Sequence, residues 1–150
     1  MKNTFIITIA TVIVLTLSYC NTEDKKLDLN GQGLTSLPQD VFQKQELEWL
    51  NLGGNDLTSL PTEIGQLQNL IELELGGNNL KSLPSEIGQL KNLKELRLSK
   101  NNLTSLPPEI GNLQNLSYLF IYDNNIPEAE RQKIESWLPN CDIIWEDPYF

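Results

Sequence analysis

One phrase of 23 residues is repeated along this chain. The segment LPTEIGQLQNLIELELGGNNL begins at Leu60, and LPSEIGQLKNLKELRLSKNNL begins at Leu83. The leucines keep their places, while the residues between them change in charge and polarity. A unit this short cannot bury its apolar residues alone, so neighbouring copies must stack to share a core. The repeat therefore predicts a solenoid.

Within each copy, the leucines alternate with variable residues. The copies begin at residues 24, 47, 70, 93 and 116 and read DKKLDLNGQGL, LEWLNLGGNDL, LIELELGGNNL, LKELRLSKNNL and LSYLFIYDNNI. Alternation with period two is typical of a half-buried strand, so Leu50 and Leu52 should point to one side and Trp49 and Asn51 to the other. Stacked copies predict a parallel sheet over a continuous leucine core.

The pattern LxxLxLxxNxL, which recurs in phase from Asp24 to Ile126, resembles the leucine-rich repeat family. The intervening LPxEIGxLxNL segments resemble bacterial repeats that are common in spirochaetal proteins. This resemblance implies an α/β solenoid with a curved parallel sheet on the concave face and short helices or 3-10 turns on the convex face. We assign residues 21–126 to about five repeats, of which the first is degenerate, and residues 127–150 to a C-terminal cap.

Three residue types recur at fixed places between the strands. An asparagine follows each strand except the first, where Gln32 takes its place, and a buried amide can pair backbone groups that leave a sheet. A proline begins each convex segment, which suits a first helical residue. A glycine is expected to bend the chain where three of these segments end. The residues are Asn55, Asn78, Asn101 and Asn124, then Pro38, Pro61, Pro84 and Pro107, then Gly65, Gly88 and Gly111.

The repeat loses its phase near the C-terminus. The stretch CDIIWE predicts a last strand with Cys141, Ile143 and Trp145 facing inward. Six strands would hold Cys141 about 24 Å from the first strand, too far for a disulfide with Cys20, so we expect a buried thiol. Before this strand, PEAERQKIESWL predicts a helix that completes the cap and places these residues near one face: Ala129, Lys133, Ile134, Trp137 and Leu138.

Residues 1–20, MKNTFIITIATVIVLTLSYC, differ in composition from the rest of the chain. Lys2 precedes an apolar run from Phe5 to Leu17, which is shorter than the roughly 20 residues of a membrane-spanning helix. The pattern predicts a secretory signal peptide, and an uncleaved anchor is the alternative. The ending LSYC resembles a bacterial lipobox, which implies lipidation of Cys20, although Tyr19 stands where a small residue is usual. Cleavage after Ser18 without lipidation is the competing interpretation.

The composition excludes most catalytic chemistry. The chain has no histidine, which is the commonest general base and a frequent metal ligand. It has no nucleophile elbow, phosphate loop or zinc spacing, and no aspartate cluster completes a calcium site around its recurring glutamates. With 11 basic and 20 acidic residues, it has no basic patch for nucleic acid. We expect a protein that is not an enzyme and that needs no cofactor or metal.

Binding is expected on the concave face, at the positions where the copies differ. Exposed aromatic residues beside an arginine are typical of binding hot spots. An acidic middle, edged by Lys94 and Lys100, lies next to them. The predicted partner-binding residues are Trp49, Glu72, Glu74, Glu95, Arg97, Tyr118, Phe120 and Tyr122. As alternatives, Ile144 and the tail DPYF cover the aromatic cluster, and the acidic middle is only a solvated surface.

Two functions fit these observations. The first is an exported, non-enzymatic module that binds a protein through the concave sheet, with a basic partner favoured by the net charge of −9. The second is a structural envelope lipoprotein, tethered to the membrane through Cys20 and without a specific soluble partner. The sequence identifies neither the partner nor the oligomeric state.

Overall fold

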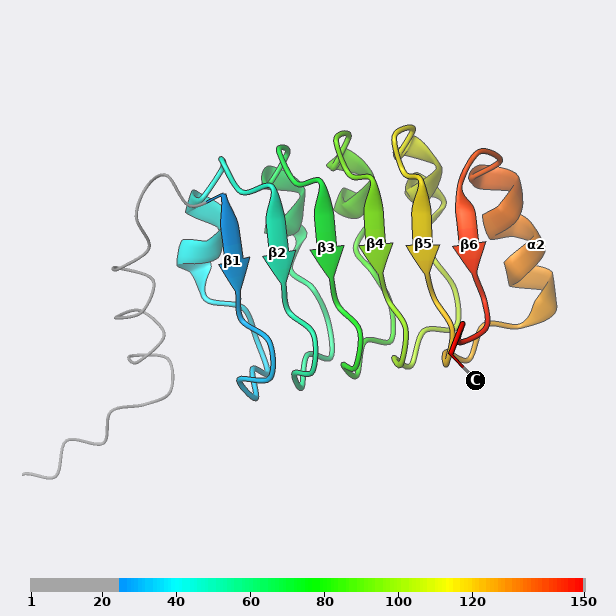
Figure 1. Ribbon diagram of the computed structural model, residues 1–150, viewed down its shortest axis with the longest axis horizontal. Helices are drawn as coiled ribbons and strands as arrows, with labels where there is room; N and C mark the ends of the chain where they lie inside the picture. The colour runs from blue at the N-terminus through cyan, green and yellow to red at the C-terminus, as the bar shows by residue number, and fades with distance from the viewer. Residues whose placement is uncertain (1–24, 150) are drawn as a thin grey trace, which may run out of the picture.

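The structure, a computed structural model, describes residues 25–149, and these form a solenoid (Figure 1). All six strands belong to one sheet, in which they follow chain order and every pairing is parallel. The predicted fold class is therefore confirmed. The strands are β1 (Lys26–Asp28), β2 (Trp49–Asn51), β3 (Glu72–Glu74), β4 (Glu95–Arg97), β5 (Tyr118–Phe120) and β6 (Asp142–Ile144).

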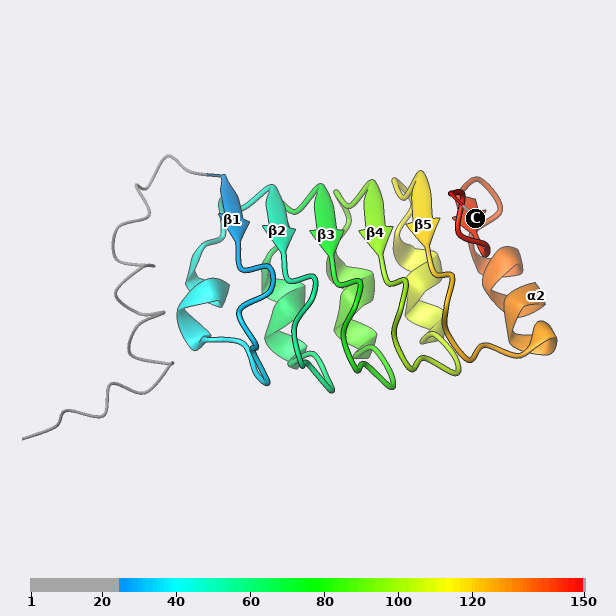
Figure 2. The same ribbon diagram turned by 60° about the horizontal axis from the view of Figure 1, so that its bottom comes forward.

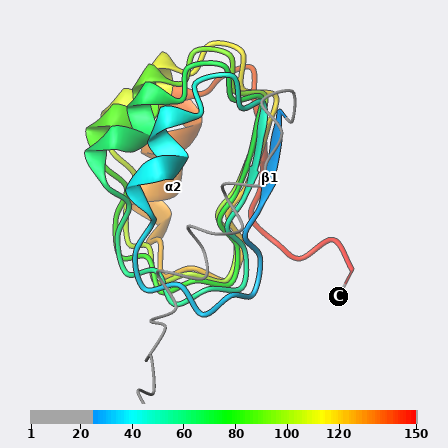
Figure 3. The same cartoon turned by 90° about the vertical axis from the view of Figure 1, so that its left-hand side faces the viewer.

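The helices lie on the opposite side of the core from the sheet, as the end-on view in Figure 3 shows. Figure 2 shows the 3-10 helices side by side behind the strands, with α2 at the C-terminal end. The convex segments are 3-10 helices, which agrees with the expectation of short helices or 3-10 turns. They are η1 (Gln39–Gln43), η2 (Thr62–Gln66), η3 (Ser85–Gln89) and η4 (Pro108–Asn112), and the longer helix is α2 (Glu128–Trp137).

The core is a stack of leucines held in register by the sheet. In β1 to β5 the central residue is a leucine that pairs with the central residue of the next strand, so Leu50 lies beside Leu73 and Leu73 beside Leu96. These three side chains are buried, as are the isoleucines of the 3-10 helices, such as Ile64 and Ile87. Burying a leucine side chain contributes about 1.5–3 kcal/mol. Stacking in register therefore gives every repeat a share of one core.

The asparagines that follow the strands form the predicted ladder. The Asn78 amide donates to the carbonyls of Leu52 and Leu75 at 2.9 and 3.0 Å, and its oxygen accepts the Leu57 N–H at 3.0 Å. Asn55 and Asn101 make the corresponding bonds and are buried as well. Each amide therefore ties the turn of its own repeat to the turn of the preceding one.

The sequence analysis missed a second asparagine series on the convex side. Asn69, Asn92 and Asn115 each donate from the side chain to a backbone carbonyl of the preceding repeat, at 2.7–2.9 Å. They are the asparagine of the LPxEIGxLxN phrase, which recurs as regularly as the first series. The two series join neighbouring repeats at two separate places around each turn of the solenoid.

Two expectations for the convex segments were wrong in detail. Pro61, Pro84 and their equivalents precede the 3-10 helices as N-caps with extended backbone, one position before the expected one. Gly65 and Gly88 lie inside the 3-10 helices and have no left-handed φ. A Cβ atom at Gly65 would lie 2.6 Å from the Gln89 side chain, and one at Gly88 would overlap the carbonyl oxygen of Glu109. These glycines permit close packing between repeats.

The cap consists of α2 and β6, as predicted, but only part of the expected helix face is buried. Ile134 and Leu138 are buried and Trp137 packs against the core, whereas Ala129 and Lys133 are exposed. Lys133 pairs instead with Glu130 along the helix surface. The face is narrower than expected because α2 covers the repeats mainly through its C-terminal half, where Trp137 lies over Gly111 of η4.

The last strand closes the core through its inward residues. Cys141, Ile143 and Trp145 pack against the core as predicted. Burial raises the pKa of the Cys141 thiol to about 11, so it stays protonated at neutral pH. Cys20 and the rest of the predicted leader, residues 1–20, lie outside the described residues. Among residues 25–149, no helix is long and apolar enough to span a bilayer.

The ladder predicts a specific loss of stability for Asn78→Ala. The carbonyls of Leu52 and Leu75 each keep a second asparagine donor, but the Leu57 N–H loses the partner that the structure shows. We expect the free energy of unfolding to fall by about 2 kcal/mol, measured by urea denaturation. Asn79→Ala, at the exposed neighbouring position, should change it by less than about 0.5 kcal/mol. Equal effects of the two changes would contradict this role.

The packing of the 3-10 helices predicts that Gly88→Ala is destabilising. The new methyl group would meet the backbone of Glu109, which cannot move aside as a flexible side chain can. We expect a loss of about 1–3 kcal/mol in the free energy of unfolding, measured in the same way. Gln66→Ala, at an exposed position of η2, is the control. If Gly88→Ala left the free energy of unfolding unchanged, close packing would not explain the glycine.

Candidate functional site

The candidate site is the sheet face, meaning the side chains of the strands that point away from the core. In each strand, the residues before and after the central leucine point outward, so two rows cross the sheet in register. The first row is Lys26, Trp49, Glu72, Glu95, Tyr118 and Asp142. The second row is Asp28, Asn51, Glu74, Arg97, Phe120 and Ile144. A six-stranded sheet thus brings residues from the whole repeat region onto one surface.

A hollow of about 220 Å³ lies on this face over β3, between β2 and β4. The Leu73 side chain is buried in the core, so the β3 backbone forms the floor. The walls include five of the eight predicted site residues and one that the prediction omitted, Asn51. The lining residues are Trp49, Asn51, Glu72, Leu73, Glu74, Glu95 and Arg97. Their shared register could have revealed Asn51, which lies between Asp28 and Glu74 in the second row.

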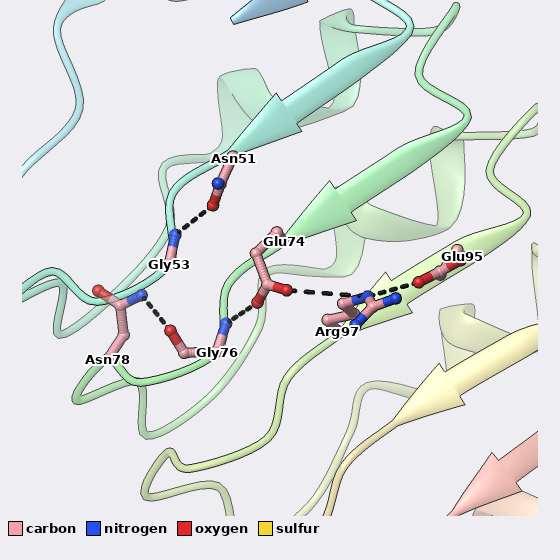
Figure 4. Close-up of polar contacts among 7 residues, drawn as sticks. All are labelled: Asn51, Gly53, Glu74, Gly76, Asn78, Glu95 and Arg97. Carbon is pink, nitrogen blue, oxygen red and sulfur yellow. Dashed lines mark hydrogen bonds and ion pairs between the residues drawn. The ribbon is translucent and has the colours of Figure 1, made fainter. Parts of the chain in front are cut away.

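Arg97 is the centre of the polar contacts in the hollow (Figure 4). Its Nε pairs closely with Glu95 on the same strand, and lies 3.8 Å from Glu74 on β3. On its other side, the guanidinium stacks over the Phe120 ring, 4.6 Å from the ring centroid. The arginine therefore joins the acidic middle to the aromatic cluster. Glu72 lies on the same face without a salt bridge to any residue of 25–149.

Glu74 is a partly buried carboxylate in the hollow. Burial raises the pKa of Glu74, while the Gly76 N–H, which donates to Oε1 at 2.6 Å, and Arg97 oppose that rise. Asn51 and Asp28 accept the N–H two residues further on in the same way, at 3.0 Å. In the first three strands, the outward residue after the leucine therefore also caps the turn that follows. A carboxylate in this position is partly desolvated and keeps one oxygen toward Arg97.

The aromatic cluster lies at the C-terminal end of the sheet face. Tyr118 is 47% exposed, whereas Phe120 is half-buried between Arg97 and Ile144 on the adjacent strands. Tyr122 follows β5, and the Lys100 ammonium lies 6.0 Å from the centroid of its ring. Lys100 and Lys94 are exposed and do not line the hollow. The predicted grouping is thus found in space, with each aromatic ring in a different environment.

The alternative in which Ile144 and the tail cover these rings is only partly realised. Ile144 lies beside Phe120 on the neighbouring strand and extends the apolar surface. The tail after β6 leaves the sheet on the outward side, as Figure 3 shows, and Tyr149 is 89% exposed. Tyr118 thus stays exposed, while Ile144 adds an aliphatic side chain beside Phe120.

This surface presents charged and aromatic side chains on an open sheet. Among residues 25–149, no group of three side chains could hold a metal ion. The carboxylates lie on an open sheet, and Arg97 pairs with both Glu74 and Glu95. An acid–base pair needs carboxyl groups with widely separated pKa values in a site that excludes water. The arrangement places charged side chains beside an aromatic surface.

Comparison with known proteins defines the class of the protein. A leucine-rich repeat region family model matches residues 14–119, so the chain belongs to the leucine-rich repeat family. This family and its fold generally serve as non-enzymatic scaffolds for protein interactions. No curated protein sequence matches the chain.

Solved structures with the same fold come from bacteria and plants. A leucine-rich repeat protein of Leptospira interrogans is 48% identical with a TM-score of 0.73, over 74% of this chain and 28% of that one. The functional domain of InlJ from Listeria monocytogenes, which includes a cysteine ladder, is 26% identical with a TM-score of 0.62, over 77% and 24%. The plant peptide hormone receptor RGFR1, solved in complex with RGF2, is 35% identical with a TM-score of 0.64, over 79% and 20%. The chain thus spans only about a quarter of each of these proteins.

Proposed function

We propose that this chain is a non-enzymatic interaction module that binds a protein partner through its sheet face. The observation that carries the proposal is the surface formed by Arg97, Phe120, Tyr118 and Ile144, in which an arginine stacked on one aromatic ring adjoins a second, exposed ring. Aromatic and arginine side chains dominate the binding energy of protein interfaces. An exposed apolar patch on a repeat scaffold is typical of a binding surface.

The construction of the repeats supports this choice of surface. The leucines, the two asparagine series and the packed glycines all serve the stack itself. Beyond β3, the outward side chains of the sheet make few such structural contacts. These outward positions are also where the side chains differ most between the copies. The plant receptor of the same fold was solved in complex with RGF2, which is consistent with a role in binding for this fold.

Export belongs to the proposal as well. The basic start and short apolar run of residues 1–20 have the pattern of a secretory signal peptide. Its LSYC ending favours, as a second candidate function, a structural envelope lipoprotein held at the membrane by an acylated Cys20. Each buried methylene of such an anchor would contribute about 0.8 kcal/mol to membrane binding. The two proposals differ in whether a specific protein partner exists.

A triple variant of the sheet face tests the interaction module. Arg97→Ala, Tyr118→Ala and Phe120→Ala together remove the guanidinium and both rings, while the leucine core is unchanged. We expect proteins that the wild-type chain captures from extracts of its own cells to be lost at least tenfold, because hot-spot residues each contribute about 2 kcal/mol or more. Quantitative mass spectrometry of the captured proteins is the measurement.

The control for this test is a triple variant of exposed residues between the strands and the 3-10 helices, Thr58→Ala, Lys81→Ala and Thr104→Ala. It should capture the same proteins as the wild type. Thermal unfolding of both variants shows that the fold is kept. Equal capture by the wild type and the sheet-face variant, or capture of nothing by either, would reject the sheet face as the binding surface.

The anchor is tested by Cys20→Ala. If Cys20 is acylated, the wild-type chain will fractionate with membranes and incorporate labelled palmitate, and the variant will do neither. Cys141→Ala is the matched control, because the thiol of Cys141 packs against the core. Identical fractionation and labelling of wild type and Cys20→Ala would remove the lipid anchor and leave export without a tether.

A further inference from the structure

The hollow over β3 has an excess of negative charge that the protein leaves partly unpaired. It contains the carboxylates of Glu72, Glu74 and Glu95 and only one cationic group, the guanidinium of Arg97. The arginine Nε already contacts Glu95 and lies near Glu74. Glu72 is exposed and has no salt bridge within the described part of the chain. The negative charge of the hollow therefore exceeds its positive charge, which favours a second cation there.

The shape and the remaining wall suit a cationic side chain. The volume of about 220 Å³ is larger than a water or a small ion requires. Trp49, half-buried, stands beside Glu72 on the adjacent strand, and the indole face of a tryptophan attracts ammonium and guanidinium groups. Asn51 adds an amide to the lining of the hollow. The partly desolvated Glu74 is a carboxylate whose charged form a nearby cation would favour.

A second contact surface lies at a fixed distance from the hollow. Tyr118, Phe120 and Ile144 form the apolar end of the sheet face, beginning on β5. Because β5 is two strands from β3, the two surfaces are separated by roughly 10 Å. Lys94 and Lys100 border this region without entering the hollow. A ligand that crosses the strands meets negative charge first and apolar surface two strands later.

We propose that the sheet face binds an extended segment of the partner protein that places an arginine or lysine side chain in the hollow over β3 and an apolar side chain on Tyr118, Phe120 and Ile144. This inference rests on the proposed function and specifies the chemistry of the partner. Residues three apart in a polyproline II segment lie about 9 Å apart on one face, which matches two strand spacings. The recognition element is thus a basic residue followed or preceded, three residues away, by an apolar one.

The test uses the peptide acetyl-Gly-Arg-Pro-Pro-Leu-Gly-amide, titrated into the full isotope-labelled chain up to millimolar concentration and followed by NMR. We expect shifts of the Trp49 indole N–H and of backbone amides in β2 to β5. A peptide with citrulline in place of arginine keeps the shape and removes the charge. It should bind at least threefold more weakly, and added salt should weaken the arginine peptide more than the citrulline peptide.

The matched protein variants are Glu72→Gln and Glu46→Gln, which remove the same charge from two exposed positions. We expect Glu72→Gln to weaken the arginine peptide about threefold and to leave the citrulline peptide unchanged. Glu46→Gln, outside the sheet face, should bind both as the wild type does. Absent shifts, shifts outside β2 to β5, or equal binding of the two peptides would overturn the proposal.

Failure of this inference is distinguishable from failure of the proposed function. If the sheet-face triple variant loses a captured protein but Glu72→Gln keeps it and the peptide does not bind, the face is an interaction surface with a different partner chemistry. If the triple variant captures what the wild type captures, the interaction module itself is rejected.

Discussion

The turns that follow β1 to β4 each depend on a side-chain amide of the next repeat. Asn78 accepts the N–H of Leu57, which belongs to the preceding repeat, and donates to carbonyls of both repeats. Without this amide, the Leu57 N–H would lose its partner in the buried interior, at a cost of about 1–3 kcal/mol. The hydrogen bonds of one repeat are therefore completed only by the next repeat. The leucines and glycines recur with the same 23-residue period.

The outward side chains of the sheet are not needed for this stacking. Leucine stacking, the second asparagine series and the tight approach at Gly65 and Gly88 fix the positions inside and behind the sheet. Since these contacts supply the stability, outward side chains can change without loss of the core. The register of the sheet fixes which outward residues are neighbours, so Arg97 lies beside Glu74 and Phe120.

How much could be read from the sequence follows from these two kinds of position. The strands, the leucine core and the buried asparagines are fixed by periodicity, so they could be predicted residue by residue. The role of Gly65 and Gly88 could not, because it depends on how closely the next repeat approaches, and a sequence shows the glycine but not its neighbour. The narrow buried face of α2 was missed for a similar reason: amphipathic spacing does not show which end of a helix meets the core.

The candidate site was predicted as a set of residues but not as a set of contacts. Register alone placed Arg97 next to Glu74 and Phe120; that its guanidinium would contact both, and Glu95 as well, required side-chain geometry. Asn51 was omitted although it points outward in the same row as Glu74. In the structure it both caps the following turn and lines the hollow.

That double role divides the sheet face into two halves. Asp28, Asn51 and Glu74 each accept a backbone N–H two residues on, which requires an acceptor side chain. In β4 and β5 the same position is Arg97 and Phe120, and neither side chain can accept a hydrogen bond. Released from capping, these two side chains stack on each other at the surface. From β4 onward, the side chain after the central leucine is therefore no longer needed to cap the turn that follows.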